Sequence, residues 1–307
     1  MKACIDIGGT KVAVSLNSGK DLELLARRSE PTATSGSNDA LALQVIRMVD
    51  EACAEEGIAP ASVQRAGVAS CGPFVMQDGL IELAAPNICG GLAGPDRGLP
   101  NDWQTALLEG PLRQRFREVR VENDGVAALE AERRWGALQG LDHCAYVTWS
   151  TGVGTGLCVD GRILRGKNGN AGHAGHMFVT DNDDALCGCG NVGDVEALIA
   201  GNAIDRRFGA DAKSLLQRAE AGDTEALAVV DDLCRVMGRA LYNMIVTLDL
   251  QRISLGGGVF WNNRDFLLPR LTAQIRGKLG ALTDGCELVP AGLEDRVGDY
   301  AALALLV

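Results

Sequence analysis

The sequence predicts an α/β protein built from two lobes of similar construction. The first observation is the length, because 307 residues exceed a single domain of about 100–200 residues. The second is a strand, a glycine-rich turn and a returning strand that occur once in each half of the chain, which indicates a duplicated architecture. The third is the hydrophobic fraction of 47%, which is ample for buried cores and excludes wholesale disorder.

In the first half, short apolar runs bounded by turn residues predict strands, and apolar residues at helical spacing predict a helix. A segment rich in Gly, Pro and Asn predicts a long loop, and loops of that length are usually functional. On these grounds we expect, in order, strands at 3–7 and 12–16, a helix at 40–56, a strand at 65–70, a loop at 86–102, a strand at 119–122 and a helix at 125–135.

The second half opens with the repeated hairpin and continues with helices. We expect strands at 145–149 and 155–159, helices at about 194–207, 211–220 and 223–248, a strand at 252–255 and a last helix at 298–306. The predicted lobes are an N-terminal small lobe at 1–122, joined by a C-terminal helix at 290–307, and a C-terminal large lobe at 123–289.

The charge balance disfavours two classes of partner. Lys and Arg number 29 against 40 Asp and Glu, which gives a formal net charge of −11. Nucleic acids and anionic membranes bind positive surfaces, so we expect neither as a partner. The opening residues do not resemble a secretory signal, and no apolar run approaches the roughly 18 residues of a spanning helix. We therefore expect a cytoplasmic protein whose ten cysteines are reduced.

Three glycine clusters follow predicted strands. Glycine lets backbone N–H groups approach a phosphate without a Cβ in the way, and a nearby carboxylate can hold Mg²⁺ through water. Each cluster alone is also compatible with an ordinary turn, and none matches the P-loop or dinucleotide-binding pattern. Together they favour one nucleotide site, whose expected residues are Asp6, Gly8, Gly9, Thr10, Lys11, Thr151, Gly152, Gly154, Gly256, Gly257 and Gly258.

Asn123 and Asp124 lie between a predicted strand and a predicted helix. One interpretation is a helix N-cap, which both residue types favour. The other makes Asp124 a general base that accepts the proton of a hydroxyl as it attacks a phosphoryl group. The local sequence leaves both interpretations open.

A possible metal site follows in a glycine-rich segment. Two of the three histidines, His173 and His176, and the only close cysteine pair, Cys187 and Cys189, fall within 22 residues that end at Asp194. Tetrahedral zinc takes nitrogen and sulfur ligands and occasionally a carboxylate oxygen, which makes His176, Cys187 and Cys189 suitable ligands. Asp194 or another group would be the fourth, and a metal-free loop is the alternative.

Taken together and in this order, the motifs resemble the ROK family (repressor, open reading frame, kinase). The matching segments run nearly end to end and comprise Asp6–Lys11, Pro86–Asn87, Asn123–Asp124, Ser150–Gly154, Gly172–His176, Cys187–Gly190, Gly193–Glu196 and Gly256–Gly258. The resemblance implies the two-lobed actin-like ATPase fold, which is ribonuclease H-like, with ATP and a sugar in the cleft between the lobes. It also implies an ATP-dependent sugar kinase that acts on the 6-hydroxyl.

The resemblance implies roles for individual residues. Asp124 corresponds to the catalytic base toward the sugar 6-hydroxyl. The glycine turns correspond to the loops that hold the ATP phosphates and adenosine, with Mg²⁺ near Asp6. Positions that hold sugar hydroxyls correspond to Asn87, Asn123, His176 and Glu196, and His173 would face the sugar at C1 or C2.

Two departures from the family pattern bear on substrate and metal. Most members carry glutamate where this chain has His173, and the form His-x-Gly-His is similar to that of bacterial N-acetylmannosamine kinases. Asp194 stands where the third zinc cysteine is expected, which weakens the prediction of a structural Zn²⁺ held by His176, Cys187, Cys189 and Asp194.

N-acetylmannosamine is therefore the expected substrate, with glucose, fructose and N-acetylglucosamine as alternatives within the family. A catalytically silent sugar sensor and a filament-forming protein of the superfamily are alternatives from other classes. Several ROK members begin with a DNA-binding module, which we do not expect here because the first motif starts at Asp6. A homodimer is expected by analogy with similar kinases.

Overall fold

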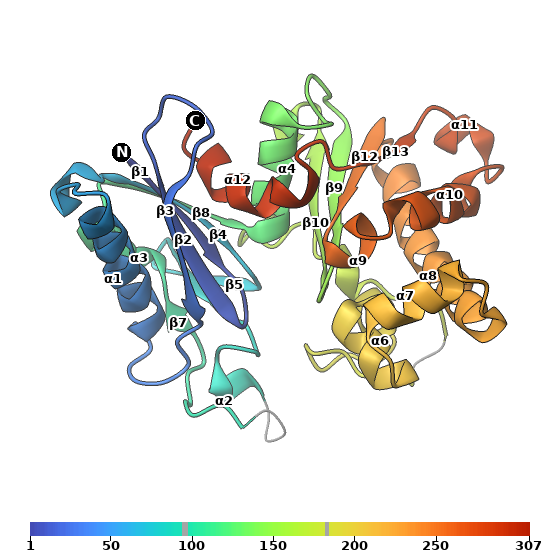
Figure 1. Ribbon diagram of the computed structural model, residues 1–307, viewed down its shortest axis with the longest axis horizontal. Helices are drawn as coiled ribbons and strands as arrows, with labels where there is room; N and C mark the ends of the chain where they lie inside the picture. The colour runs from blue at the N-terminus through green and yellow to red at the C-terminus, as the bar shows by residue number, and fades with distance from the viewer. Residues whose placement is uncertain (94–97, 182–183) are drawn as a thin grey trace. The chain divides into compact units, whose positions relative to one another are not determined.

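The computed structural model describes residues 1–93, 98–181 and 184–307 and divides into two compact units (Figure 1). The first unit comprises residues 1–131, 165–171 and 298–307, and the second comprises residues 132–164 and 172–297. The predicted lobe boundary at 122 precedes helix α4 (Asp124–Trp135), whereas the first unit also includes most of that helix. Among the described residues, no helix is both long enough and apolar enough to cross a membrane.

The first unit is built on a five-stranded sheet in the order β3-β2-β1-β4-β8. Antiparallel pairing of β1 with β2 confirms the predicted hairpin, and β3 extends it, while β4 and β8 continue the sheet in parallel. Ile5 and Val68 in its central strands are fully buried, as expected of a sheet covered on both faces. The strands are β1 Lys2–Ile7, β2 Lys11–Asn17, β3 Leu25–Pro31, β4 Arg65–Ser70 and β8 Glu118–Asn123.

Two helices cover the faces of this sheet. Helix α1 (Ala40–Glu55) packs on β2 and β3, and its apolar residues share a core with Ala66 and Val68 of β4. Side chains alternate along a strand, so Gly67 points to the opposite face, where it meets α12 (Val297–Ala304). A Cβ at Gly67 would overlap the carbonyl oxygen of Ala302. Gly67 therefore allows α12 to lie directly against the backbone of β4.

A second, three-stranded sheet in the order β5-β6-β7 completes the first unit. The predicted loop at 86–102 contains the short helix α2, and its residues 94–97 lie outside the described residues. The elements of this region are β5 Phe74–Gln77, β6 Leu80–Leu83, α2 Gly90–Ala93, β7 Ala106–Leu107, α3 Glu109–Arg115 and the 3₁₀ helix Pro60–Ser62.

The second unit repeats the topology of the first. Its sheet has the order β11-β10-β9-β12-β13, in which β9, β10 and β11 are antiparallel neighbours and β12 and β13 continue in parallel. The strands are β9 Cys144–Trp149, β10 Val153–Val159, β11 Arg162–Ile163, β12 Arg252–Gly256 and β13 Glu287–Pro290. The same sequence of pairings in both units confirms the duplication that the repeated hairpin predicts.

The helix predicted at 194–207 is wrong as a single element, because Ala200 is extended (φ −61°, ψ 151°) and separates α5 from α6. The break lets Gly201 N donate a hydrogen bond to Ser150 O at 2.8 Å, a tertiary contact that local spacing does not reveal. The helices are α5 Val195–Ile199, α6 Gly201–Phe208, α7 Ala212–Glu220, α8 Thr224–Leu248, α9 Gly258–Trp261, α10 Arg264–Ile275, α11 Gly280–Thr283 and the 3₁₀ helices Ala174–His176 and Glu294–Arg296.

A buried carboxylate organises one end of the second unit. Glu132, near the end of α4, is 0% exposed, and its carboxylate accepts hydrogen bonds from three segments. The donors are Ala137 N at 3.0 Å, Ser254 Oγ at 2.9 Å, Gly292 N at 3.0 Å and Leu293 N at 2.8 Å. These bonds replace the hydration that burial removes. Glu132 thus fastens β12 and the segment before α12 to the end of α4.

Candidate functional site

The first glycine turn joins β1 to β2 and is held from one side by Thr32. Gly8 N donates to Lys11 O at 2.8 Å, which closes the turn. The Thr32 hydroxyl donates to Gly8 O at 2.8 Å, and Thr32 N donates to Thr10 O at 3.1 Å. Sequence reasoning missed Thr32, since a threonine just after a strand gives no signal of a contact with a turn more than 20 residues away.

The structure brings a predicted sugar residue onto this turn. A Cβ at Gly9 would overlap the side-chain amide of Asn87, so the two residues are in direct contact only because residue 9 is glycine. Asn87 is itself exposed. An amide that can donate and accept hydrogen bonds therefore lies beside backbone predicted to bind phosphate.

Two carboxylates belong to the same corner of the first unit. Asp6 is in β1 and partly buried, while Asp124 is exposed at the first position of α4. Burial, and then the nearby charge of Asp124, raise the pKa of Asp6 to about 6, and Lys11 partly offsets this rise. The proximity of Asp6 and Asp124 is what a reaction centre that needs a base and a bound cation requires.

The capping and the functional interpretations of Asn123 and Asp124 are compatible. Gly125 N donates to Asn123 Oδ1 at 3.0 Å and to Asp124 Oδ1 at 2.8 Å. The buried Asn123 amide also donates to Ser70 O at 3.5 Å, which ties it to the end of β4. These bonds orient both side chains at the carboxyl ends of parallel strands, where ligands bind in open α/β sheets.

The second glycine turn, between β9 and β10, is held by the helices that follow. Ser150 N donates to Gly152 O at 2.9 Å, and Gly201 N donates to Ser150 O at 2.8 Å. Val153 N donates to the Glu196 carboxylate at 2.9 Å. The structure therefore places Glu196, predicted to hold a sugar, against the predicted phosphate turn.

The third glycine cluster lies next to the second. Gly257 has a left-handed φ of +86°, and a Cβ there would lie 2.5 Å from Trp149 O. Gly258 begins α9, and a Cβ on it would lie 3.9 Å from Ser150 Oγ. The structure thus brings the second and third clusters together in the second unit, while the first cluster belongs to the first unit.

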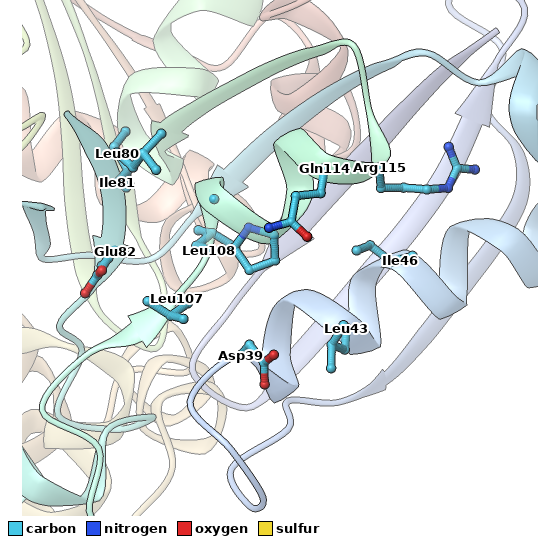
Figure 2. A pocket seen from close by; sticks show the side chains of 12 residues that line it. Asp39, Leu43, Ile46, Leu80, Ile81, Glu82, Leu107, Leu108, Gln114 and Arg115 are labelled. Atoms are coloured by element: carbon cyan, nitrogen blue, oxygen red, sulfur yellow. The ribbon is translucent and has the colours of Figure 1, made fainter. Parts of the chain in front are cut away.

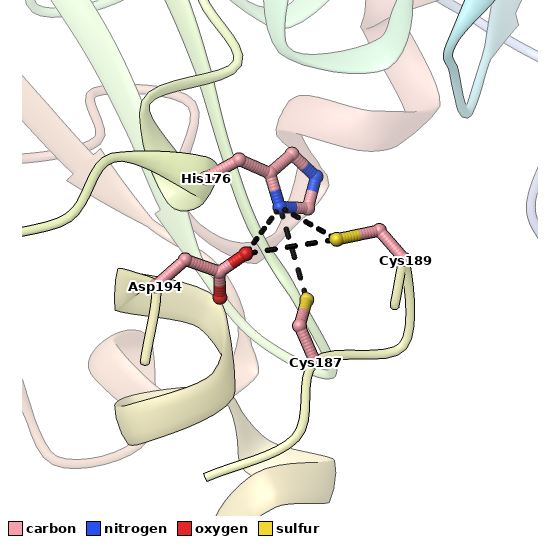
Figure 3. A group of neighbouring side chains, drawn as sticks. All are labelled: His176, Cys187, Cys189 and Asp194. Carbon is pink, nitrogen blue, oxygen red and sulfur yellow. Dashed lines mark hydrogen bonds and ion pairs between the residues drawn. The ribbon is translucent and has the colours of Figure 1, made fainter. Parts of the chain in front are cut away.

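The four predicted metal ligands converge in the second unit (Figure 3). His176 Nδ1 lies 3.0 Å from Asp194 Oδ2, 3.6 Å from Cys189 Sγ and 3.8 Å from Cys187 Sγ. Zinc bonds of about 2.0–2.3 Å at tetrahedral angles place ligand atoms about 3.3–3.8 Å apart. The donor types suit zinc, and the distances from His176 to the two sulfur atoms match this spacing, whereas the 3.0 Å between His176 and Asp194 is the shorter distance of a direct hydrogen bond.

Hydrogen bonds and burial shift the pKa values of the residues in this metal corner. Asp194 is 0% exposed and caps α5 by accepting a hydrogen bond from Ala197 N at 2.7 Å. Burial would raise the pKa of Asp194, but the bonds from His176 and Ala197 outweigh it and hold that pKa below its ordinary value. The bond to Asp194 likewise raises the pKa of His176. Burial raises the pKa of the Cys187 thiol.

His173 stands beside the metal corner with an unused polar atom. Its ring stacks on that of His176, with centroids 5.9 Å apart and planes at 21°. Burial, and then the neighbouring His176, lower the pKa of His173, which favours the neutral ring. Its Nε2 is buried and has no hydrogen-bond partner among the described residues. An ordered water or a ligand group can be the partner of such an atom.

A cavity elsewhere in the first unit was not predicted. The cavity has a volume of about 510 Å³. Figure 2 shows its lining side chains, which come from α1, α3, β6 and neighbouring residues and include Leu43, Ile46 and Leu108. None of the predicted site residues lines it.

Comparisons with known proteins agree with the motifs. A family model described as "ROK family" matches residues 2–307. The N-acetylmannosamine kinase of Salmonella newport (strain SL254) is 34% identical over 266 residues, which cover 83% of this chain and 82% of that protein.

Solved structures give the same result for the fold. A ROK hexokinase from Thermus thermophilus is 30% identical with a TM-score of 0.73, covering 98% of this chain and 96% of that one. A ROK family glucokinase from Streptomyces griseus, solved with glucose and AMPPNP, is 25% identical with a TM-score of 0.72, covering 98% and 97%. These likenesses confirm the two-lobed actin-like ATPase fold. With the match across residues 2–307, they show that this chain belongs to the ROK family.

Proposed function

We propose that this protein is an ATP-dependent sugar kinase that phosphorylates the 6-hydroxyl of a hexose or N-acetylhexosamine. The observation that carries the proposal is the corner of the first unit where Asp6 and Asp124 are close to each other and Asn87 lies on the first glycine turn. The relatives named as kinases support it, and one of them was solved with glucose and an ATP analogue.

In the proposed reaction, Asp124 accepts the proton of the sugar hydroxyl while the hydroxyl oxygen attacks the γ-phosphorus of ATP and ADP leaves. Asn87 and Asn123 orient the sugar. N–H groups of the turns at 8–11 and 150–154 and of residues 256–258 neutralise phosphate and position adenosine. Asp6 would hold Mg²⁺ through water, and the ion would supply charge neutralisation at the phosphates. The location of ATP and the sugar between the lobes stays a prediction.

We propose N-acetylmannosamine as the substrate. The 34% identity to an N-acetylmannosamine kinase supports this choice, as does His173, a neutral ring with an unpartnered Nε2 where an N-acetyl or hydroxyl group can bond. Glucose, fructose and N-acetylglucosamine are the alternatives, and the glucokinase likeness favours glucose among them.

A coupled ADP-release assay with these four sugars tests both proposals. We expect N-acetylmannosamine to give the highest kcat/KM. A higher kcat/KM with another of these sugars would identify that sugar as the substrate instead. Sugar binding by calorimetry without turnover of any sugar would instead indicate a sensor.

We also propose that His176, Cys187, Cys189 and Asp194 hold one structural zinc ion per chain. Three side chains of the types that zinc prefers and one buried carboxylate support the proposal. Elemental analysis of the purified protein should find about one zinc, and Cys187→Ser should lower that content. A protein without zinc whose activity and thermal stability are unaffected by chelator would show that this group is an ordinary loop.

By analogy with similar kinases, we propose that the protein is a homodimer. Light scattering during size-exclusion chromatography measures the mass and distinguishes a dimer from the 32.3-kDa monomer.

A further inference from the structure

We propose that Glu196 is a positioning residue that couples the metal corner to the glycine turn at 150–154, so that nucleotide affinity depends on the metal ligands. The metal corner here means His176, Cys187, Cys189 and Asp194. The inference rests on the proposed function, because it takes the turn at 150–154 to contact the nucleotide. It adds a role for Glu196 that sugar binding alone does not include.

The first step is the contact between Glu196 and the turn. Glu196 Oε2 accepts a hydrogen bond from Val153 N at 2.9 Å. A Cβ at Gly152 would lie 2.7 Å from the same oxygen, so the carboxylate occupies space that any other residue at 152 would fill. A hydrogen bond to an ionised acceptor is stronger than one between neutral groups. Glu196 therefore fixes the peptide between Gly152 and Val153.

The same helical segment holds the other side of the turn. Gly201 N donates to Ser150 O at 2.8 Å, and Asn202 N donates to Thr151 O at 3.4 Å. These donors are at the start of α6, which follows α5 after one extended residue, Ala200. The turn is thus attached at several points to the α5–α6 segment and takes its position from it.

The second step is the attachment of α5 to the metal corner. Asp194 is the N-cap of α5 and a member of the ligand set, and Glu196 follows it in the first turn of the helix. Val195 N donates to Met177 O at 3.0 Å, next to His176. Cys187 Sγ also lies 3.9 Å from Glu196 Oε1, the carboxylate oxygen that does not bond the turn.

These contacts form a short chain from the ligands to the turn. A zinc ion would hold Asp194 in place together with its three partners, and Asp194 fixes the start of α5. Without the ion, fewer bonds restrain that start, and Glu196 is only two residues away. We therefore expect loss of the metal ligands to loosen the turn and weaken nucleotide binding.

Calorimetric titration with ADP and Mg²⁺, in the absence of sugar, tests the first step. Glu196→Ala should weaken ADP binding about tenfold, which corresponds to about 1.4 kcal/mol, because the turn loses the bond that holds Val153 N. Glu196→Gln, whose amide oxygen still accepts a bond, should lose less. Glu225→Gln is the matched control, because Glu225 is an exposed glutamate in the first turn of α8.

The inference would be overturned if the Glu196→Ala variant bound ADP as tightly as the wild type and lost only sugar affinity. That result would leave the proposed function intact. If the wild-type protein binds no ADP, both the inference and the proposed function are contradicted. Thermal unfolding of each variant verifies that it folds, and Glu196→Gln keeps the test valid if the alanine variant does not.

The second step is tested by removing zinc with chelator, with the metal content measured by elemental analysis. The zinc-free wild type should bind ADP several-fold more weakly, and Cys189→Ser should behave like it. The Glu196→Ala variant should lose less affinity than the wild type when zinc is removed, because its side-chain link to the turn is already gone and only the backbone bonds from Gly201 and Asn202 remain. Unchanged ADP affinity of the zinc-free wild type, or a protein that takes up no zinc from excess metal, would show that the coupling does not exist.

Discussion

Asp6 and Asp124 carry the proposed chemistry from different surroundings. Asp124 is exposed, whereas Asp6 is partly buried and its pKa is raised to about 6 by burial and then by Asp124. Ionised Asp6 therefore destabilises the folded state relative to the unfolded chain. Groups whose pKa is perturbed by burial and a nearby charge cluster at functional sites, which supports a ligand-binding role for Asp6.

This loss of stability predicts that the effect of Asp6→Asn on the free energy of unfolding depends on pH. The folded pKa lies above the unfolded value, so the folded state binds more protons between about pH 4 and 6 and loses stability as pH rises through that window. The neutral variant avoids this loss and should be more stable than the wild type by on the order of 3 kcal/mol at pH 8, but not at pH 4. Urea unfolding at both pH values measures the difference. An equal effect at the two values would contradict the assignment.

At the scale of single residues, motifs predicted most members of the candidate site but not the residues that hold them in place. Gly8, Gly9 and Asp6 are recognisable because the residue type and its place at or just after the end of a strand restrict what they can do. Thr32 and the bond from Val153 N to Glu196 are not recognisable, since each depends on backbone that is distant in the sequence. The sequence predicted a sugar contact for Glu196, and only the fold shows its bond to the turn.

Elements with strong local patterns were predicted, and elements decided by tertiary contacts were not. The two hairpins and α8 have clear periodicity and turn residues, and the structure confirms them. Edge strand β3 was missed because its sequence, LARRSEP, is mostly polar and none of its residues is buried. Helix α10 was missed, and it contains Pro269, which normally argues against a helix. The single helix predicted at 194–207 is divided where Gly201 reaches Ser150.

The packing of α12 on β4 leads to a prediction at the level of elements. Gly67→Ala places a methyl group where the carbonyl oxygen of Ala302 lies, so the helix must move away from the strand. We expect a loss of about 1–3 kcal/mol in the free energy of unfolding, the usual cost of overpacking. Gly298→Ala, in the same helix, is the control, because a Cβ there meets nothing within 4 Å. Equal stability of the two variants in urea would contradict this packing.

At the scale of the whole molecule, both units have the same sheet topology. Each unit has a sheet of two antiparallel pairings followed by two parallel ones, and a glycine turn joins the first two strands of each. The repeated hairpin was enough to predict the duplication. From the sequence, the C-terminal helix was also expected to join the first lobe, and residues 298–307 belong to the first unit. The strand order was not predicted, because it depends on long-range pairing that local patterns do not encode.

The central claim is that Asp124 is the base of a sugar kinase. The most direct test compares Asp124→Asn with the wild type in the ADP-release assay and measures sugar and ADP affinity by calorimetry. Asp78→Asn is the control, because Asp78 is an exposed aspartate of the first unit with a left-handed φ of 51° that asparagine tolerates. We predict that Asp124→Asn lowers kcat by about 10²–10⁴ while both affinities and the control stay near wild type. Near wild-type turnover by Asp124→Asn would contradict the account.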